Sequence, residues 1–138
     1  MTIRYAAQAD LAACLAMDGH LPEGAYAPKL AAKQVYILSE AGEDLALLRF
    51  GFLWASIPFC NLLYVAAGAR GRGYGRALTE RWEADMKARG YDLAMTSTQA
   101  DEDGQQFYRA LGYRDCGGLT LPFPGYEQPT ELILARAL

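Results

Sequence analysis

The segment Arg70-Gly71-Arg72-Gly73-Tyr74-Gly75-Arg76 contains three glycines and three arginines in seven residues. An apolar stretch at residues 61–65 precedes it, and apolar residues at helical spacing follow it. Glycine lets a turn bring backbone N–H groups close to a ligand, because no Cβ intervenes. A helix N-terminus adds unpaired N–H donors and partial positive charge, and arginine donates charge-assisted hydrogen bonds to phosphate. The segment therefore predicts a strand–loop–helix unit that binds a pyrophosphate.

Two common phosphate motifs do not match this spacing. A P-loop needs Lys-Ser or Lys-Thr after its glycines, and neither pair follows here. A Rossmann fingerprint, G-x-G-x-x-G, fits Gly71 and Gly73 but meets Arg76 in place of its third glycine. The spacing Arg70-x-x-Gly73-x-Gly75 instead resembles the R/Q-x-x-G-x-G/A signature of the GNAT superfamily of N-acetyltransferases, whose members hold the pyrophosphate of acetyl-CoA.

Length and charge limit the classes of protein that this chain can be. Its 138 residues suit one domain, residues 1–138, with a single core. The formal net charge of −3 argues against a general nucleic-acid or anionic-membrane surface, so we expect neither as a partner. Against that acidic background the arginines of the glycine segment form a local positive site.

The cysteines and the apolar runs indicate where the protein resides. Cys14, Cys60 and Cys116 are odd in number and widely spaced, without a C-x-x-C pair. This pattern predicts buried free thiols in a reducing compartment rather than a metal site or a disulfide framework. We find no signal-peptide core at the start of the chain and no apolar run of membrane-spanning length, so we expect a cytoplasmic protein.

The periodicity of apolar residues predicts an α/β domain with a mixed sheet and helices on its faces. Asp10 is the expected N-cap of the first helix, and residues 19–28 are expected to form a loop. The predicted strands cover residues 3–5, 35–38, 45–54, 61–65, 92–97, 113–121 and 131–138, and the predicted helices cover residues 10–17, 27–33, 74–89 and 101–111.

Three side-chain patterns give more local predictions. Phe50, Phe52 and Trp54 alternate along one predicted strand, so all three are expected on the same face of the sheet. Glu83 and Lys87 stand four residues apart in the long helix, which predicts an ion pair on its exposed surface. The apolar stripe that docks this helix on the sheet is expected to comprise Tyr74, Leu78, Trp82 and Met86.

A second motif strengthens the resemblance to the GNAT superfamily. Residues 101–113 read D-E-D-G-Q-Q-F-Y-R-A-L-G-Y, and they resemble the family pattern N-x-x-A-x-x-F-Y-x-x-L-G-F at the expected distance from the glycine segment. Asp101 and Gly104 stand where the family often has asparagine and alanine. The resemblance covers essentially the whole chain. It implies a single-domain, mostly antiparallel sheet flanked by helices and splayed between the fourth and fifth strands.

The resemblance also implies an activity. It suggests an N-acetyltransferase that uses acetyl-CoA, without a metal, and transfers the acetyl group directly to a primary amine of a small molecule or peptide. A homodimer is possible, as is common in the family. Two alternatives stay open at this point. One is a non-catalytic CoA-binding or sensing module, and the other is a nucleotide-binding protein whose loop binds ligands similar to ADP.

The same resemblance assigns site residues. Tyr108 matches the family tyrosine that protonates the leaving thiolate, although an aromatic side chain there also packs well against a sheet. A backbone N–H of the strand ending at Tyr64 and Val65 is expected to polarise the acetyl oxygen. Asp101 is either a cofactor contact or a helix N-cap. The predicted cofactor-binding residues are Tyr64, Val65, Arg70, Gly71, Arg72, Gly73, Tyr74, Gly75, Arg76 and Asp101.

The general base and the acceptor are not fixed by the residues. Glu23, Glu127, Asp101 and His20 are candidates for the base, but we favour a solvated surface position for each and assign the base to none of them. Cys60 suggests an acetyl-cysteine relay, but no base stands next to it in the sequence, so we favour direct transfer. The loops at residues 19–28 and 122–128 are expected to select the acceptor.

Overall fold

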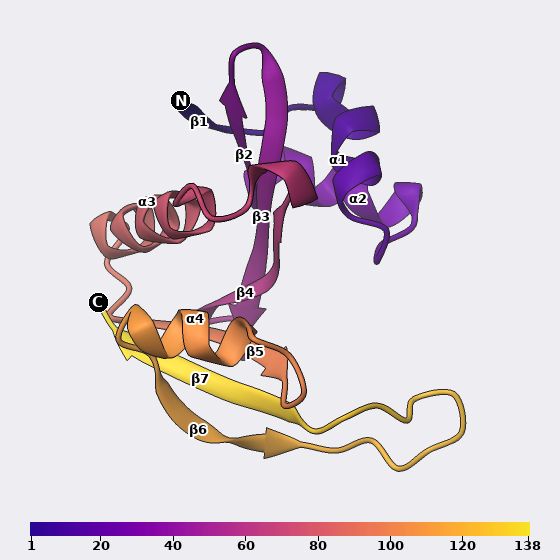
Figure 1. Cartoon of the computed structure of the whole chain (residues 1–138), viewed down its shortest axis with the longest axis vertical. Coiled ribbons are helices and arrows are strands. Elements are labelled where there is room, and N and C mark those ends of the chain that lie inside the picture. Colours follow the sequence, from indigo (N-terminus) through magenta and orange to yellow (C-terminus); the bar gives the residue numbers. More distant parts are fainter.

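The computed structural model describes all 138 residues, and at its centre lies a seven-stranded sheet in the order β1-β2-β3-β4-β5-β7-β6 (Figure 1). Every neighbouring pair is antiparallel except β4 and β5. This arrangement confirms the predicted α/β class. The strands are β1 (Thr2–Tyr5), β2 (Val35–Glu40), β3 (Glu43–Leu53), β4 (Ile57–Val65), β5 (Leu93–Gln99), β6 (Arg114–Leu119) and β7 (Glu131–Ala137).

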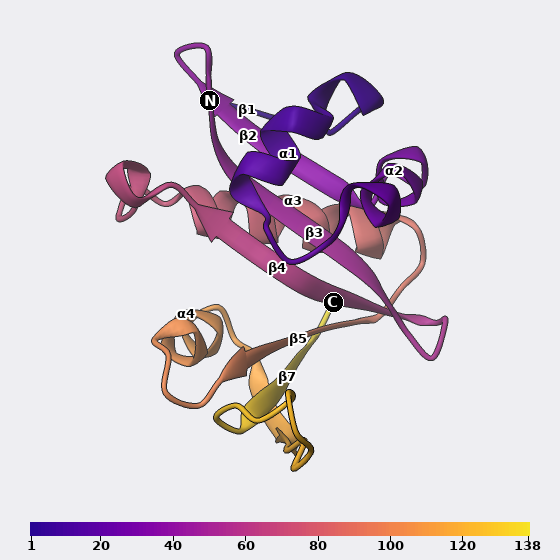
Figure 2. The same ribbon diagram turned by 90° about the vertical axis from the view of Figure 1, so that its right-hand side faces the viewer.

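Four α-helices cover the sheet. They are α1 (Leu11–Met17), α2 (Glu23–Ala31), α3 (Tyr74–Ala88) and α4 (Gly104–Ala110), with short 3-10 turns at η1 (Gln8–Asp10) and η2 (Ala67–Ala69). Figure 2 shows α3 behind the β1–β4 part of the sheet and α1 and α2 in front of it, while α4 lies beside β5. No helix has the length and apolar character needed to cross a bilayer.

The central strands are buried on both faces, as their continuous apolar runs require. Tyr36 and Leu38 of β2 join the cluster under α3, whereas Val35 and Ile37 join the cluster under α1 and α2. The predicted stripe of α3 is confirmed, because its four residues are at most 7% exposed. Each fully buried large apolar side chain contributes roughly 1.5–3 kcal/mol to folding.

Two predictions of local structure were wrong at chain reversals. Trp54 is 80% exposed, because it and Ala55 adopt positive φ in the three-residue turn, residues 54–56, between β3 and β4. The α2 helix begins at Glu23, inside the predicted loop, and includes Pro28. Docking of Tyr26 and Leu30 in the core offsets the hydrogen bond that proline removes.

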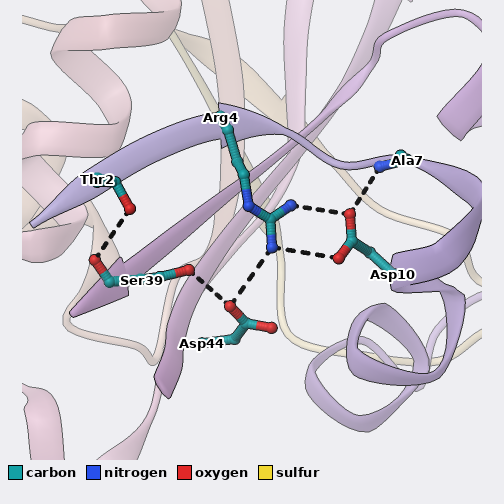
Figure 3. Close-up of polar contacts among 6 residues, drawn as sticks. All are labelled: Thr2, Arg4, Ala7, Asp10, Ser39 and Asp44. Atoms are coloured by element: carbon teal, nitrogen blue, oxygen red, sulfur yellow. Dashed lines mark hydrogen bonds and ion pairs between the residues drawn. The ribbon is translucent and has the colours of Figure 1, made fainter. Parts of the chain in front are cut away.

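Asp10 occupies the N-cap position of α1, as predicted, but its side chain makes no capping hydrogen bond to that helix. Its carboxylate accepts hydrogen bonds from Arg4, at 2.8 and 3.2 Å, and from the backbone N–H of Ala7, at 2.8 Å (Figure 3). The Ala7 hydrogen bond is the largest influence on the pKa of Asp10, which lies below its ordinary value. Arg4 also lies 3.6 Å from Asp44. These contacts tie β1 to η1 and to the start of β3.

Glu83 lies in a buried network instead of pairing with Lys87 on the surface. Its carboxylate accepts a hydrogen bond from the Tyr113 hydroxyl at 2.7 Å and another from Arg136 at 3.0 Å. Burial, and then the nearby Glu83 carboxylate, raise the pKa of Tyr113. The network joins α3 to β7 and to the residue before β6, so it holds the two parts of the sheet together.

Candidate active site

Strands β4 and β5 separate after only two bridged pairs. Phe59 lies opposite Met95 and Cys60 lies opposite Thr96, and no pair follows although both strands continue. Figure 2 shows the two strands diverging from this point. The register against β3 shifts here, leaving Asn61 as the extra residue of a bulge that bends β4. The predicted splay between the fourth and fifth strands is therefore confirmed, and we call it the fork.

The bulge and the alternation of β4 determine which backbone groups face the fork. The N–H of Ala66 donates to the carbonyl oxygen of Leu45, which places Ala66 in a hydrogen-bonded pair with β3. In an antiparallel ladder such pairs alternate along the strand. The backbone of Tyr64 is therefore directed at β3, whereas the backbone groups of Leu63 and Val65 face the open edge. That edge has two N–H donors without a strand partner.

The glycine segment turns the chain from β4 into α3. Gly71 and Gly73 have φ of +78° and +83°, values that L side chains adopt only with strain, and apart from their chain neighbours no residue has an atom within 4 Å of a Cβ added at either position. The first bond of α3 runs from the N–H of Ala77 to the carbonyl of Gly73. The three amides between them are consequently unpaired at the positive end of the helix dipole, as an anion site requires.

The three arginines of the segment differ in their partners. Arg70 and Arg72 donate only to backbone carbonyl oxygens of the preceding residues, at 3.1 and 3.3 Å. Both side chains are exposed, and neither forms an ion pair. Arg76 instead pairs with Glu80, at 2.8 Å, on the surface of α3. Arg70 and Arg72 therefore supply unneutralised positive charge, whereas Arg76 must leave Glu80 to reach an anion.

The start of α3 lies against the open edge of the fork. A Cβ at Gly75 would lie 3.6 Å from the side chains of Leu63, Val65 and Phe107. Phe107 belongs to α4, which packs on the β5 side of the fork. The glycine segment, the free edge of β4 and α4 thus meet in one place, although they are separated along the chain.

Tyr108 lies at the base of the fork. Its side chain is buried beside Cys60 and Thr96, the last bridged pair of β4 and β5. Burial, and then the neighbouring Cys60, raise the pKa of Tyr108 well above its ordinary value. The hydroxyl is therefore protonated at neutral pH. A protonated phenol can donate its proton, and the role of Tyr108 as the acid stays a prediction.

Cys60 is poorly suited to act as a nucleophile. Its Sγ lies 3.6 Å from the carbonyl oxygen of Leu62, and its residue is 3% exposed. Burial raises the pKa of the Cys60 thiol to about 11. Because the thiolate is the reactive form, the protonated thiol disfavours an acetyl-cysteine relay.

Asp101 is placed in the turn between β5 and α4. The N-cap position of α4 belongs to Asp103, so the interpretation of Asp101 as the N-cap was wrong. The Asp101 side chain is exposed and makes no hydrogen bond within the protein. Its contact with a cofactor stays a prediction.

The other candidate bases lie in three different segments. Glu23 begins α2, and Glu127 lies in the loop between β6 and β7; both are exposed. His20 follows α1, where its Nδ1 lies 3.5 Å from the buried carboxylate of Asp18. None of these side chains is hydrogen-bonded to Tyr108, so none is singled out as the base. No cluster of three His, Cys, Asp or Glu side chains is placed to hold a metal ion.

Several polar residues that our sequence reasoning missed lie on the sheet face under α1 and α2. Arg49 donates to the fully buried carboxylate of Asp18, and the two atoms lie 2.6 Å apart. A cavity of about 370 Å³ opens nearby, and its lining includes Lys29, Gly51 and Asn61. The signal available in the sequence was Gly51, because a glycine inside a strand often marks a site where a ligand approaches closely.

Comparisons with known proteins agree with this geometry. Residues 31–115 match the sequence model of the family described as Acetyltransferase (GNAT) domain. No curated protein matches the chain at a significant level. Solved structures with the same fold are numerous, and at identities of 22% or less their likeness establishes the fold alone.

Three of these structures illustrate the likeness. A ribosomal-protein-alanine N-acetyltransferase from Brucella melitensis is 20% identical with a TM-score of 0.82, and the match covers 100% of both chains. Ard1 from Thermoplasma volcanium is 13% identical with a TM-score of 0.86, over 99% of this chain and 97% of that one. A GNAT family acetyltransferase from Elizabethkingia anophelis with acetyl-CoA bound is 17% identical with a TM-score of 0.73, over 99% of this chain and 97% of that one.

Proposed function

The chain belongs to the GNAT acetyltransferase family, and from that membership we propose that it is an N-acetyltransferase that uses acetyl-CoA and acts on a primary amine. One observation carries the proposal. The fork between β4 and β5 has a buried, protonated tyrosine at its base and a loop rich in glycine and arginine at its open end. Both features suit acetyl-CoA, since its phosphates are anionic and its leaving group is a thiolate.

The glycine segment suits the pyrophosphate of the donor. The unpaired amides at the start of α3 supply N–H donors, and Arg70 and Arg72 supply charge that no carboxylate neutralises. Tyr74 contributes only its backbone, because its side chain is buried in the core. Gly71 and Gly73 give the loop its backbone conformation, and Gly75 and Arg76 complete the first turn of the helix.

The free edge of β4 suits the reacting end of the donor. The backbone N–H groups of Leu63 and Val65 have no acceptor on a neighbouring strand. Such donors stabilise the negative charge that develops on an acetyl oxygen. One preorganised donor of this kind is worth about 10²–10³ in kcat. Tyr64, between them, keeps the edge in register through its pairing with β3.

Transfer requires the amine to arrive neutral and aligned. Its nitrogen attacks the acetyl carbon, a C–N bond forms, the C–S bond breaks and the electron pair remains on sulfur. Tyr108 supplies a proton to that sulfur and regains one from solvent, to which the amine also loses its proton. Alignment in one site supplies much of the acceleration. Because Cys60 is protonated, we infer direct transfer without a covalent enzyme intermediate.

The compartment follows the same reasoning. All three cysteines are free; Cys14 and Cys60 are buried as predicted, whereas Cys116 is exposed. Free thiols suit a reducing environment, so we place the protein in the cytoplasm.

Two measurements, made one after the other, test the proposal. The first is the shift in melting temperature on titration with acetyl-CoA, with ADP as the control. A ligand at 100 times its Kd adds about 2.7 kcal/mol of stability. The second is release of free CoA on addition of amines. A shift with acetyl-CoA and amine-dependent release support the enzyme. A shift without release for any amine indicates a non-catalytic CoA-binding module, and equal shifts with ADP indicate a nucleotide-binding protein.

A further inference from the structure

A cavity of about 370 Å³ lies on the sheet face under α2, and its volume suits a small molecule. We call it the Lys29 pocket. Its polar groups come from α2 and β4, its floor is in β3, and apolar side chains form the rest of its wall. The lining residues are Lys29, Gly51, Phe52, Leu53, Phe59 and Asn61.

Gly51 keeps the pocket open. It lies inside β3, opposite Phe59. Glycine weakens a strand, and the backbone here does not require it, because Gly51 does not have a positive φ. A Cβ added there would lie 3.2 Å from Lys29 Nζ and 3.2 Å from Asn61 Nδ2. The missing side chain therefore leaves a space onto which an ammonium and an amide nitrogen both converge.

The pocket has an uncompensated positive charge. Lys29 is partly buried and appears in none of the ion pairs or side-chain hydrogen bonds of the structure. Burial, and then the nearby Arg49, lower the pKa of Lys29. The charge of Arg49 itself is balanced by Asp18. A partly buried ammonium without a partner, beside an amide, is complementary to an anionic oxygen group.

The pocket adjoins the fork from the face opposite α3. Phe59 and Asn61 line it, and they flank Cys60, whose side chain belongs to the cluster under α3. The same segment of β4 thus has Tyr108 and the last strand pair on one side and the Lys29 pocket on the other. A molecule bound in this pocket lies next to the point where β4 and β5 separate.

We propose that the Lys29 pocket binds the carboxylate of the acceptor, so that the acceptor is a small amine that also carries a carboxylate group. This inference rests on the proposed acetyl transfer and names the class of its second substrate. The ammonium of Lys29 and the amide of Asn61 hold the carboxylate over Gly51, and the amine extends along β4 to the fork. Amines without an anionic group, such as polyamines, are disfavoured because they leave Lys29 unpaired and add a second cation.

Matched pairs of amines test the proposal. Each pair consists of an α- or ω-amino acid and its primary amide, which differ in the charge of one group. For the preferred skeleton we expect kcat/KM for the acid to exceed that for the amide at least tenfold. Lys29→Met should remove this preference, with the Kd for acetyl-CoA unchanged. Lys33→Met, which removes an exposed lysine just beyond α2, should keep it. Gly51→Ala should raise KM for the acid.

Equal kcat/KM for acid and amide across the panel, or a preference that persists in Lys29→Met, would overturn the inference. Calorimetric binding of the same pairs to the CoA-saturated protein separates this failure from failure of the proposed function. If acetyl is transferred to amines without any preference for acids, the proposed enzyme activity stands and the carboxylate site is refuted. If the protein binds acids selectively, loses this selectivity in Lys29→Met and yet transfers no acetyl group, the carboxylate site stands and the proposed enzyme activity is refuted.

Discussion

Thr96 in β5 donates a hydrogen bond from its side-chain oxygen to the backbone carbonyl oxygen of Cys60 in β4, at a distance of 3.1 Å. Both residues are buried, and they form the last bridged pair before the strands separate. The bond therefore closes the base of the fork, next to the Tyr108 side chain.

We expect Thr96→Val to destabilise the protein. Valine has nearly the shape of threonine but leaves the buried carbonyl of Cys60 without this donor, a loss of about 1–3 kcal/mol. Thr96→Ser keeps the hydroxyl and removes one methyl group, which costs about 0.8 kcal/mol. Urea unfolding measures both. A valine variant at least as stable as the serine variant would show that the hydrogen bond does not hold the fork.

Tyr108→Phe should separate chemistry from binding. Loss of the proton donor should lower kcat by about 10²–10⁴-fold. The Kd for acetyl-CoA should change little, because the ring that packs against Phe107 and Tyr113 is retained. Tyr5→Phe is the matched control, since it removes a tyrosine hydroxyl in β1, away from the fork. Unchanged turnover in the Tyr108 variant would refute its assignment as the acid.

The features that could be predicted from the sequence are those set by neighbours along the chain. The glycine segment, the buried stripe of α3 and the succession of helices and strands along the chain follow from turn chemistry and periodicity. The position of Trp54 was predicted wrongly for a related reason. Alternation places Trp54 on the face of Phe50, but the strand ends one residue earlier, at Leu53, where the turn to β4 begins.

The features that could not be predicted depend on contacts between distant segments. Glu83 has the spacing of a surface ion pair with Lys87, yet Tyr113 and Arg136 make it a buried acceptor. The Lys29 pocket likewise needs three elements together. Local periodicity does not reveal which distant segments lie close together, so the Lys29 pocket could be identified only from the three-dimensional structure.

Gly73→Glu should abolish binding of acetyl-CoA. The substitution forces a side chain onto a φ of +83° and places a negative charge at the start of α3, where the pyrophosphate is expected. Gly42→Glu is a strict control for strain, because Gly42 has a φ of +80°, equally open surroundings and a position in the turn between β2 and β3. Calorimetric titration of both variants measures the Kd. Retained affinity in folded Gly73→Glu would exclude this loop as the phosphate site.

The Asp18–Arg49 pair should make stability depend on acid pH. Burial raises the pKa of Asp18, but the hydrogen bond from Arg49 and further donors outweigh it, so the pKa lies below its ordinary value. In the unfolded chain the pKa of an aspartate is about 3.9. The folded state therefore binds fewer protons, and this stabilisation is complete above about pH 4 and is lost as the pH falls through the folded-state pKa.

Asp18→Asn removes that dependence and leaves Arg49 buried without a counter-charge. We expect a loss of about 3–5 kcal/mol at neutral pH. The free energy of unfolding should also depend less steeply on pH between about 2 and 4 than in the wild type. Asp92→Asn, which removes an exposed carboxylate without a side-chain partner, should keep the wild-type slope. Urea unfolding across this range decides the matter: equal slopes in wild type and Asp18→Asn would mean that other carboxylates, such as Asp10, cause the acid sensitivity.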